Sequence, residues 1–374
     1  MPSSVYYIDM KASFKENLVT KLGRLMESAG VAEIVHKRDL VALKLHFGEM
    51  GNTAFVRPPF LRKIVGTVKD LGAKPFLTDA NTLYTGSRTD AVSHLETATF
   101  NGFAYSAVDA PIVIADGLKG KSETPVVVDL NHFKQVYIGS AIVDADALIS
   151  VAHFKGHELA GFGGTLKNLG MGCASRKGKL AQHSKLGPNV KRKKCIGCGD
   201  CCGHCSQGAI SVSEKKARID PELCIGCGEC IPVCPQEAIQ IRWARSIPLF
   251  MEKMVEYTLG VLQGKEARSL FINFLTDISP ACDCVPYNDA PMVRDIGILA
   301  SRDPVAIDMA SADLVNGEEA LAGSVLKENR GAGDDKFRAV YPRVDWGFQF
   351  EYAEKLGLGS RDYDLIKIDA LEPA

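Results

Sequence analysis

Residues 40–81 read LVALKLHFGEMGNTAFVRPPFLRKIVGTVKDLGAKPFLTDAN, and this stretch decides the fold class. From Val41 to Phe47 every second residue is apolar, which is typical of a strand with one buried face. A proline pair that begins at Pro58 opens a helix, and Gly72 closes it. Residues 74–78 then form a second strand that runs into a polar turn. This alternation predicts an α/β fold with a mainly parallel sheet and helices on both faces.

The same alternation recurs along most of the chain, although the middle region is less regular and is compatible with antiparallel strands. We expect further strands at 5–8, 112–114, 126–128, 136–138, 147–151, 270–275, 296–300 and 364–368. We expect further helices from Ser13 to Gly30, from 248 to 262, and from Asp303-Pro304 to about Gly317.

A cysteine repeat interrupts this pattern. The stretch CIGCGDCCGHC at 195–205 returns 29 residues later as CIGCGECIPVCP at 224–235. Both copies have gaps of two, two and three residues between cysteines, the spacing of bacterial ferredoxins. Ser206 stands where the pattern has proline, which affects the expected turn and not the ligands.

This spacing predicts two 4Fe–4S clusters. Three thiolates two residues apart can wrap one corner of a cubane, whereas the fourth lies too far round and reaches the other cluster. The alternative is a zinc site, which prefers two separated cysteine pairs in a tetrahedral shell. The expected ligand sets are Cys195, Cys198, Cys201 and Cys234 for one cluster, and Cys224, Cys227, Cys230 and Cys205 for the other.

The strand–helix pattern resumes after Arg242, which indicates an insertion. We expect one α/β domain formed by residues 1–190 and 244–374, with a ferredoxin-like insertion at 191–243. The alternative is three consecutive domains.

A glycine-rich stretch, HFKGHELAGFGGTLKNLGMG at 153–172, follows a predicted strand. Its glycines allow close backbone approach to a ligand, and its Lys and His side chains suit anion binding or proton transfer. The glycine spacing matches neither a P-loop nor a dinucleotide fingerprint. The alternative is a glycine-rich turn with a solvated polar face.

Ligands of open parallel sheets bind beyond the carboxyl ends of the strands, so polar residues at several strand ends should converge on one cleft. Taken alone, Lys44 and His46 are more typical of an exposed strand face. The candidate catalytic residues are Lys44, His46, Asp79, Asn81, His153, Lys155, His157, Lys167 and Asn168.

The stretch PACDCVP adds Cys282 and Cys284 to these candidates. A disulfide between cysteines two apart is strained and is disfavoured in a reducing compartment. Two interpretations stay open. Both residues are small and buried in a proline-bracketed loop, or both offer thiolates to a third metal or to a substrate.

Composition excludes several classes of protein. The 374 residues carry a formal net charge of −1, which argues against a general nucleic-acid or membrane-surface binder. The chain has no export signal and no apolar run of membrane-spanning length, so we expect a cytoplasmic protein. The run 176–194 holds eight Lys or Arg residues and no acid. It favours a solvated linker over a docking surface for an acidic partner.

Several of these motifs occur together in one known family. The chain resembles the family called domain of unknown function three hundred and sixty-two, in its form with a ferredoxin insertion. The resemblance rests on residues 44–48, 78–84, 153–172, 282–284, 295–298 and 303–308. It implies an iron–sulfur protein of the kind found mostly in anaerobic prokaryotes, and it names no substrate.

Three functions fit these observations. The first is an oxidoreductase in which the two clusters exchange electrons with a site near residues 153–172. The second is a non-catalytic electron carrier, or a metal or cluster assembly protein, that acts on a partner. The third is a redox sensor. A pure carrier needs little beyond the cysteine segment, so the large α/β domain favours a site for a small molecule or a partner protein.

Overall fold

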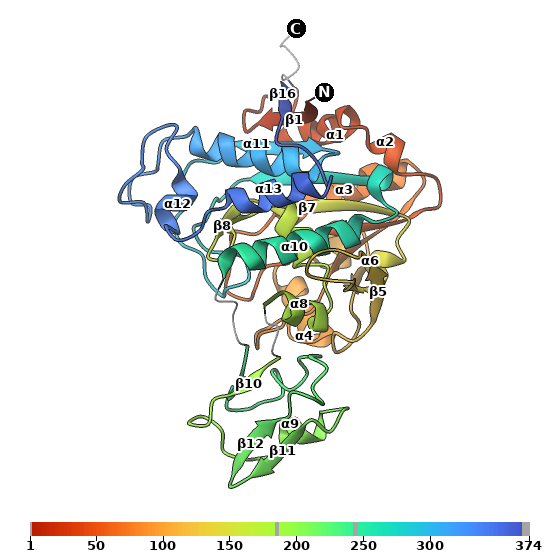
Figure 1. The fold of residues 1–374 in the computed structure, drawn as a ribbon. Helices are drawn as coiled ribbons and strands as arrows, with labels where there is room; N and C mark the ends of the chain where they lie inside the picture. Colours follow the sequence, from red (N-terminus) through yellow and green to blue (C-terminus); the bar gives the residue numbers. More distant parts are fainter. Residues whose placement is uncertain (1, 184–186, 242–245, 369–374) are drawn as a thin grey trace.

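A computed structural model describes residues 2–183, 187–241 and 246–368, and its centre is an eight-stranded sheet (Figure 1). The order across the sheet is β16-β1-β15-β14-β7-β2-β3-β4. The strands are β1 (Ser3–Asp9), β2 (Leu40–Lys44), β3 (Lys74–Asp79), β4 (Ile112–Ile114), β7 (Ala147–His153), β14 (Ser269–Leu275), β15 (Gly297–Ser301) and β16 (Tyr363–Lys367).

Only β15 runs against its neighbours, and the other neighbouring strands in this sheet pair in parallel. The predicted α/β class with a mainly parallel sheet is therefore confirmed. Strand β14 pairs directly with β7, so that Phe271 lies opposite Ser150. Segments on either side of the cysteine repeat thus share one sheet, while the predicted domain boundaries stay a prediction.

Helices cover both faces of the sheet, and each face has its own apolar core. Alternation along the strands divides the side chains, so that Val41 and Leu43 enter one core and Ala42 enters the other. The first core contains residues of α1 (Leu18–Ser28), α2 (Val31–Ile34), α3 (Pro58–Asp70), α4 (Ala91–Phe100) and α5 (Tyr105–Val108). The second contains residues of α6 (Ser140–Val143), α7 (Thr165–Gly170), α10 (Ile247–Leu262), α11 (Pro304–Asn316), α12 (Lys336–Val340) and α13 (Gly347–Lys355). Leu180 of α8 (Arg176–His183) instead joins the core of the cysteine segment.

Two antiparallel pairs stand outside the central sheet in the middle region. They are β5 (Glu123–Val127) with β6 (Gln135–Gly139), and β8 (Lys155–His157) with β9 (Gly161–Gly163). A short 3-10 helix, η1 (Glu266–Arg268), precedes β14. In the described part of the chain, no helix combines the length and the apolar character that crossing a membrane requires.

The cysteine segment projects from the end of the α/β body that lies opposite the chain termini (Figure 1). It contains α9 (Asp200–Gly203) and the strand pairs β10 (Asn189–Val190) with β13 (Ile239–Gln240), and β11 (Ile210–Ser213) with β12 (Lys216–Ile219). Its small core consists of cysteines and a few aliphatic side chains.

The first helix begins later than predicted. Helix α1 starts at Leu18, because the side chain of Asn17 caps it by accepting from the Thr20 amide. Ser13, where we expected the helix to start, instead closes a turn with Glu16 ahead of the helix. Strand β2 likewise ends at Lys44 and not at Phe47.

The linker interpretation of the basic run is wrong for its first part. Residues 176–183 form α8, in which Arg176 and Lys179 are buried. The Arg176 guanidinium donates to the carbonyl oxygens of Thr82 and Thr89, which explains how a charged helix packs against the body. Residues 184–186 of the run lie outside the described residues.

Candidate functional site

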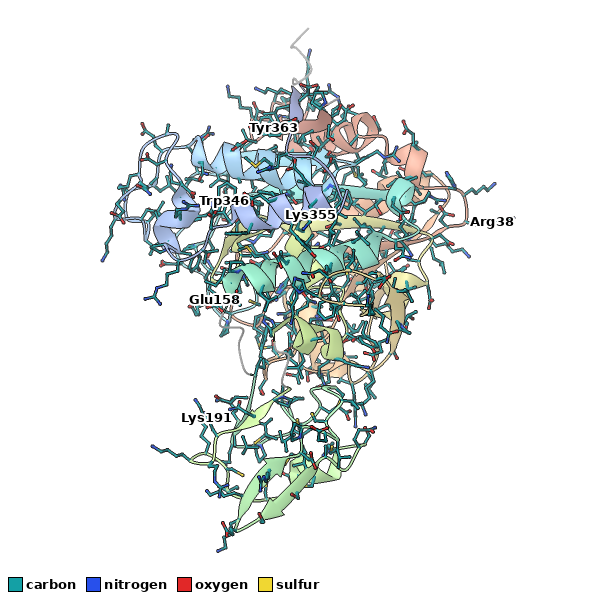
Figure 2. All side chains as sticks on the ribbon, viewed as in Figure 1. Arg38, Glu158, Lys191, Trp346, Lys355 and Tyr363 are labelled. Carbon is teal, nitrogen blue, oxygen red and sulfur yellow. The ribbon has the colours of Figure 1, made fainter. Side chains whose placement is uncertain are left out.

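A pocket of about 560 Å³ lies beyond the carboxyl ends of β2, β3 and β7. Figure 2 labels one of its lining residues, Glu158, at the left edge of the α/β body. Eight of the sequence-predicted residues line it: Lys44, His46, Asp79, Lys155, His157, Lys167, Asn168 and Cys284.

Helix α7 carries two of these residues, and a buried carboxylate fixes its start. Asp308 accepts from the amides of Thr165 at 2.7 Å and Leu166 at 2.9 Å. Gly164 permits this approach, since a Cβ there would lie 2.3 Å from Asp308 Oδ1. The glycine-rich stretch therefore ends in a short helix that holds Lys167 and Asn168 over the sheet.

Lys44 is buried, so the exposed-face interpretation is wrong for it. Its amine donates to Asn168 Oδ1 at 2.8 Å and lies 3.0 Å from Asp79 Oδ1. Asn168 donates in turn to Ser150 Oγ at 2.9 Å. This network ties the ends of β2 and β3 and the middle of β7 to α7.

Arg88 forms the second buried ion-pair network. Its guanidinium lies 3.2 Å from Glu49 Oε2 and 3.3 Å from Asp79 Oδ2, and it donates to the Tyr84 hydroxyl at 2.7 Å. Burial alone would raise the pKa of Asp79, but Lys44 and neighbouring cationic groups hold that pKa below its usual value. Asp79 is therefore an ionised anchor of the pocket wall.

The Cys282–Cys284 loop packs against the glycine-rich stretch. Asp283, between the two cysteines, faces the glycine-rich stretch. Its Oδ1 lies 2.7 Å from His153 Nδ1, and its Oδ2 lies 3.2 Å from the Lys155 amine. The Lys167 amine donates to Cys282 Sγ at 3.3 Å.

The two thiols of this loop differ in acidity. A hydrogen bond from Cys284 lowers the pKa of Cys282, and the nearby Lys167 amine acts in the same direction. The same hydrogen bond raises the pKa of Cys284. Cys282 is therefore the sulfur favoured as the thiolate.

Two histidines of the pocket wall have one ring nitrogen committed to the backbone. His46 Nδ1 accepts from the Gly48 amide at 3.0 Å, and His157 Nδ1 accepts from the Ala160 amide at 3.1 Å. Burial, supported by neighbouring cations, lowers the pKa of both rings well below the usual value. Both imidazoles are therefore neutral near pH 7, with the proton on Nε2.

Three predicted residues do not line the pocket: Cys282, which accepts from Lys167, and the strand-end residues Asn81 and His153. Asn81 donates to Asp116 Oδ1 at 2.9 Å and to the Gly117 carbonyl at 2.7 Å. His153 uses both ring nitrogens, one toward Asp283 and the other 2.8 Å from the Thr276 carbonyl. Their position indicates a supporting role for the strand ends.

The eight repeat cysteines line two small cavities in the cysteine segment. Each cavity is lined by three cysteines of one repeat and the fourth cysteine of the other. The first holds Cys195, Cys198, Cys201 and Cys234, and the second holds Cys205, Cys224, Cys227 and Cys230. Within the residues that the structure describes, no three His, Cys, Asp or Glu side chains are close enough to hold a single metal ion.

Backbone amides point at the cysteine sulfurs. The amides of Ala209 and Ala238 donate to Cys205 Sγ at 3.3 Å and Cys234 Sγ at 3.2 Å, at equivalent positions of the two repeats. The Ala217 amide donates to Cys195 Sγ at 3.3 Å. The loops are thus arranged around the sulfurs.

The second cavity adjoins the pocket. A Cβ on Gly228, which lines that cavity, would lie 3.1 Å from Leu83 Cδ1, and Leu83 also lines the pocket. The Lys121 amine lies 2.6 Å from Glu229 Oε1 at the same junction. Leu83 therefore contacts the wall of the second cavity and also lines the pocket.

The model of one protein family matches residues 41–313, which is most of the chain. The chain belongs to the family described as Domain of unknown function (DUF362). No curated protein matches it.

Two solved structures are among those to which the chain is similar. One is the lactate racemase apoprotein from Thermoanaerobacterium thermosaccharolyticum, at 13% identity and a TM-score of 0.34, over 73% of this chain and 51% of that one. The other is a Thermotoga maritima protein, at 11% identity and a TM-score of 0.42, over 81% of this chain and 59% of that one. The chain thus spans between half and three fifths of their lengths.

Several pocket residues carry no signal in the sequence. Glu49 and Arg88 sit in loops without a motif, and Lys179 is hidden in the basic run. Phe250 lies on α10, far along the chain, where its spacing indicates only a core position. Three-dimensional packing alone brings them to the site.

Proposed function

We propose that the chain is an iron–sulfur redox protein, with residues 191–243 as an inserted two-cluster segment and the strand-end pocket as its substrate site. The observation that carries this proposal is the junction at Leu83, which contacts the second cysteine cavity and lines the pocket. Electron transfer weakens steeply with distance, so adjoining sites are what an oxidoreductase requires.

The cysteine segment fits two 4Fe–4S clusters. Four thiols line each cavity in the crossed pattern of two-cluster ferredoxins, and amides donate to three sulfurs. Thiols that bind different irons of one cubane lie farther apart than the ligands of one ion, consistent with the lack of a single-ion group among the described residues. When bound, such clusters supply one-electron transfer.

The pocket residues divide into a rigid frame and groups free to act. Lys44, Asp79 and Arg88 neutralise one another and fix the wall. The neutral rings of His46 and His157 present Nε2 protons, which suits proton transfer or hydrogen bonding to a substrate oxygen.

A carrier or assembly role is the second candidate, and one observation favours it. Ile196 and Ile225, equivalent in the two repeats and adjacent to cysteines, are 58% and 51% exposed. Exposed apolar side chains beside a cluster suit a docking partner. The redox-sensor alternative has no comparable support.

Anaerobic purification with mass spectrometry of co-purifying small molecules tests the enzyme proposal. We expect a small molecule in near-stoichiometric amount, and its loss in Lys167→Met. Lys327→Met, at an exposed position away from the pocket, serves as the control. A small molecule retained equally by both variants, or none in the wild type, would favour the carrier.

A further inference from the structure

The pocket wall carries more positive than negative side chains. Five Lys or Arg residues line it against three acidic residues. Asp79 and Glu49 are engaged by buried cations, and Glu158 is exposed. The buried acids are thus already neutralised, while cations remain.

Lys167 is the cation best placed to meet a ligand. No carboxylate among the described residues lies within 4 Å of its amine, whose polar neighbour is Cys282 Sγ at 3.3 Å. Its side chain is only partly buried, and it lines the pocket. An ammonium group has three protons, so this one can donate to a ligand as well as to the sulfur.

His46 and His157 add two neutral donors beside it. Because each Nδ1 accepts a backbone amide, each Nε2 carries a proton. In the described part of the chain, neither Nε2 has a protein hydrogen-bond partner, although both rings line the pocket. Two N–H groups without a protein acceptor, and an ammonium that can donate to more than the Cys282 sulfur, thus line the same pocket.

The remaining wall is apolar. It includes Leu83, Leu159, Met171, Phe250 and Val285. The ring of Phe250 stacks between those of His157 and His183, at centroid distances of 6.4 Å and 5.1 Å. A ligand therefore meets donors on one side and carbon on the other.

We propose that this pocket binds an organic acid, with its carboxylate on Lys167, His46 and His157 and its carbon skeleton against the apolar wall. This inference deepens the proposed function and rests on it in taking the pocket as the substrate site. A carboxylate fits better than a phosphate ester, because Asp308 already occupies the first amides of α7, the groups that suit a phosphate.

Calorimetric titration of the anaerobically purified protein with 2-naphthoate and with its neutral amide, 2-naphthamide, tests the class of ligand. The two probes share a planar apolar body and differ in the anionic group. We expect naphthoate to bind at least tenfold more tightly than naphthamide, as a charge-assisted hydrogen bond implies. Naphthyl phosphate is the third probe, and we expect it to bind more weakly than naphthoate.

Matched variants test the residues. Lys167→Met should weaken naphthoate binding about tenfold or more without affecting naphthamide, whereas Lys327→Met should affect neither. His46→Gln keeps a donor near the Nε2 position and should bind within a few-fold of wild type. His46→Asn keeps an acceptor for the Gly48 amide but loses the donor, so it should lose about tenfold.

Four results would overturn the inference. Naphthoate does not bind, the acid and the amide bind equally, the phosphate binds more tightly than naphthoate, or His46→Asn binds naphthoate as tightly as His46→Gln does. Iron and sulfide assays on the same samples separate it from the proposed function. Acid binding by protein without iron or sulfide would contradict the redox proposal and leave this inference standing. Full iron content without acid binding would contradict this inference and leave the redox proposal standing.

Discussion

The cysteine segment and the strand-end pocket present two kinds of site in one chain. In the segment, residues a few positions apart line each cavity, and a repeat of 29 residues states the arrangement twice. In the pocket, Lys44, Asp79 and Asn168 meet only because β2, β3 and α7 are brought together. A site whose residues are close together in the sequence can be predicted from their spacing. A site whose residues are brought together by the fold can be predicted only in part.

The largest test of this comparison is the crossed pairing of cysteines. We expect the double variant Cys205→Ser with Cys227→Ser to lose about half of the iron, because both residues line one cavity. The double variant Cys198→Ser with Cys227→Ser damages both cavities and should lose nearly all of it. Iron and acid-labile sulfide assays on anaerobic protein measure this. Similar losses in the two double variants would disprove the crossed arrangement.

On the pocket side, the largest effect should follow from Asp283→Asn. This change removes the buried anion that faces His153 and Lys155, and an uncompensated buried charge costs about 3 kcal/mol of the free energy of unfolding. Glu33→Gln, in the exposed pair with Arg302, is the matched control and should cost less than about 1 kcal/mol. Urea unfolding measures the free energy of unfolding of both variants. Equal losses would show that the ion pairs of Asp283 are not buried.

Acid should weaken the α/β body through His94. Burial, with nearby Arg88, lowers its pKa to about 3, although Asp79 acts in the opposite direction. The unfolded chain therefore takes up the proton first, so stability is full above about pH 6.5 and falls between that value and pH 3. At pH 5 the loss from this ring should be about 2 kcal/mol.

Urea unfolding at pH 7 and pH 5 measures that loss. His94→Leu should reduce the difference in unfolding free energy between the two pH values by about 2 kcal/mol. His204→Gln, at an exposed position in the cysteine segment, should leave the difference as it is in wild type. An unchanged difference in His94→Leu would mean that His94 is not the acid-sensitive group.

The smallest effect concerns two cysteines outside the repeats. Both thiols are buried, and they differ in acidity. The lowered pKa of Cys282 predicts slow alkylation by iodoacetamide that persists below pH 8, whereas burial raises the pKa of Cys173 to about 12 and should leave it unreactive. Lys167→Met should slow Cys282 alkylation at pH 7 about tenfold. Peptide mass spectrometry reports both rates, and equal reactivity of the two thiols would contradict the assignment of the thiolate.

Most secondary structure could be predicted, because it depends on local patterns. The proline pair at Pro58 and the closing Gly72 bracket α3 within two residues of its observed bounds. The reversed direction of β15 could not be predicted, because its sequence, GILAS, is equally apolar in either direction. Helix α1 was misplaced because Ser13, with Glu16 three residues later, matches a capping motif, whereas Asn17 is the residue that caps the helix.

The pocket residues could be predicted where polar side chains lie at strand ends, and could not be predicted elsewhere. Lys44 and Asp79 follow the rule for parallel sheets, but nothing local shows that Lys44 is buried. Arg88 has no motif, and its role depends on a carboxylate from another loop, Glu49. Asp308 sits in a helix that reads as core, and only the structure shows it capping α7.

Iron and acid-labile sulfide content of the anaerobically purified wild-type chain tests the central claim most directly. The two four-cysteine cavities predict about eight irons and eight sulfides per chain. Stoichiometric zinc without acid-labile sulfide would contradict the account, because the cysteine segment would then be a structural metal site with no electrons to exchange with the pocket.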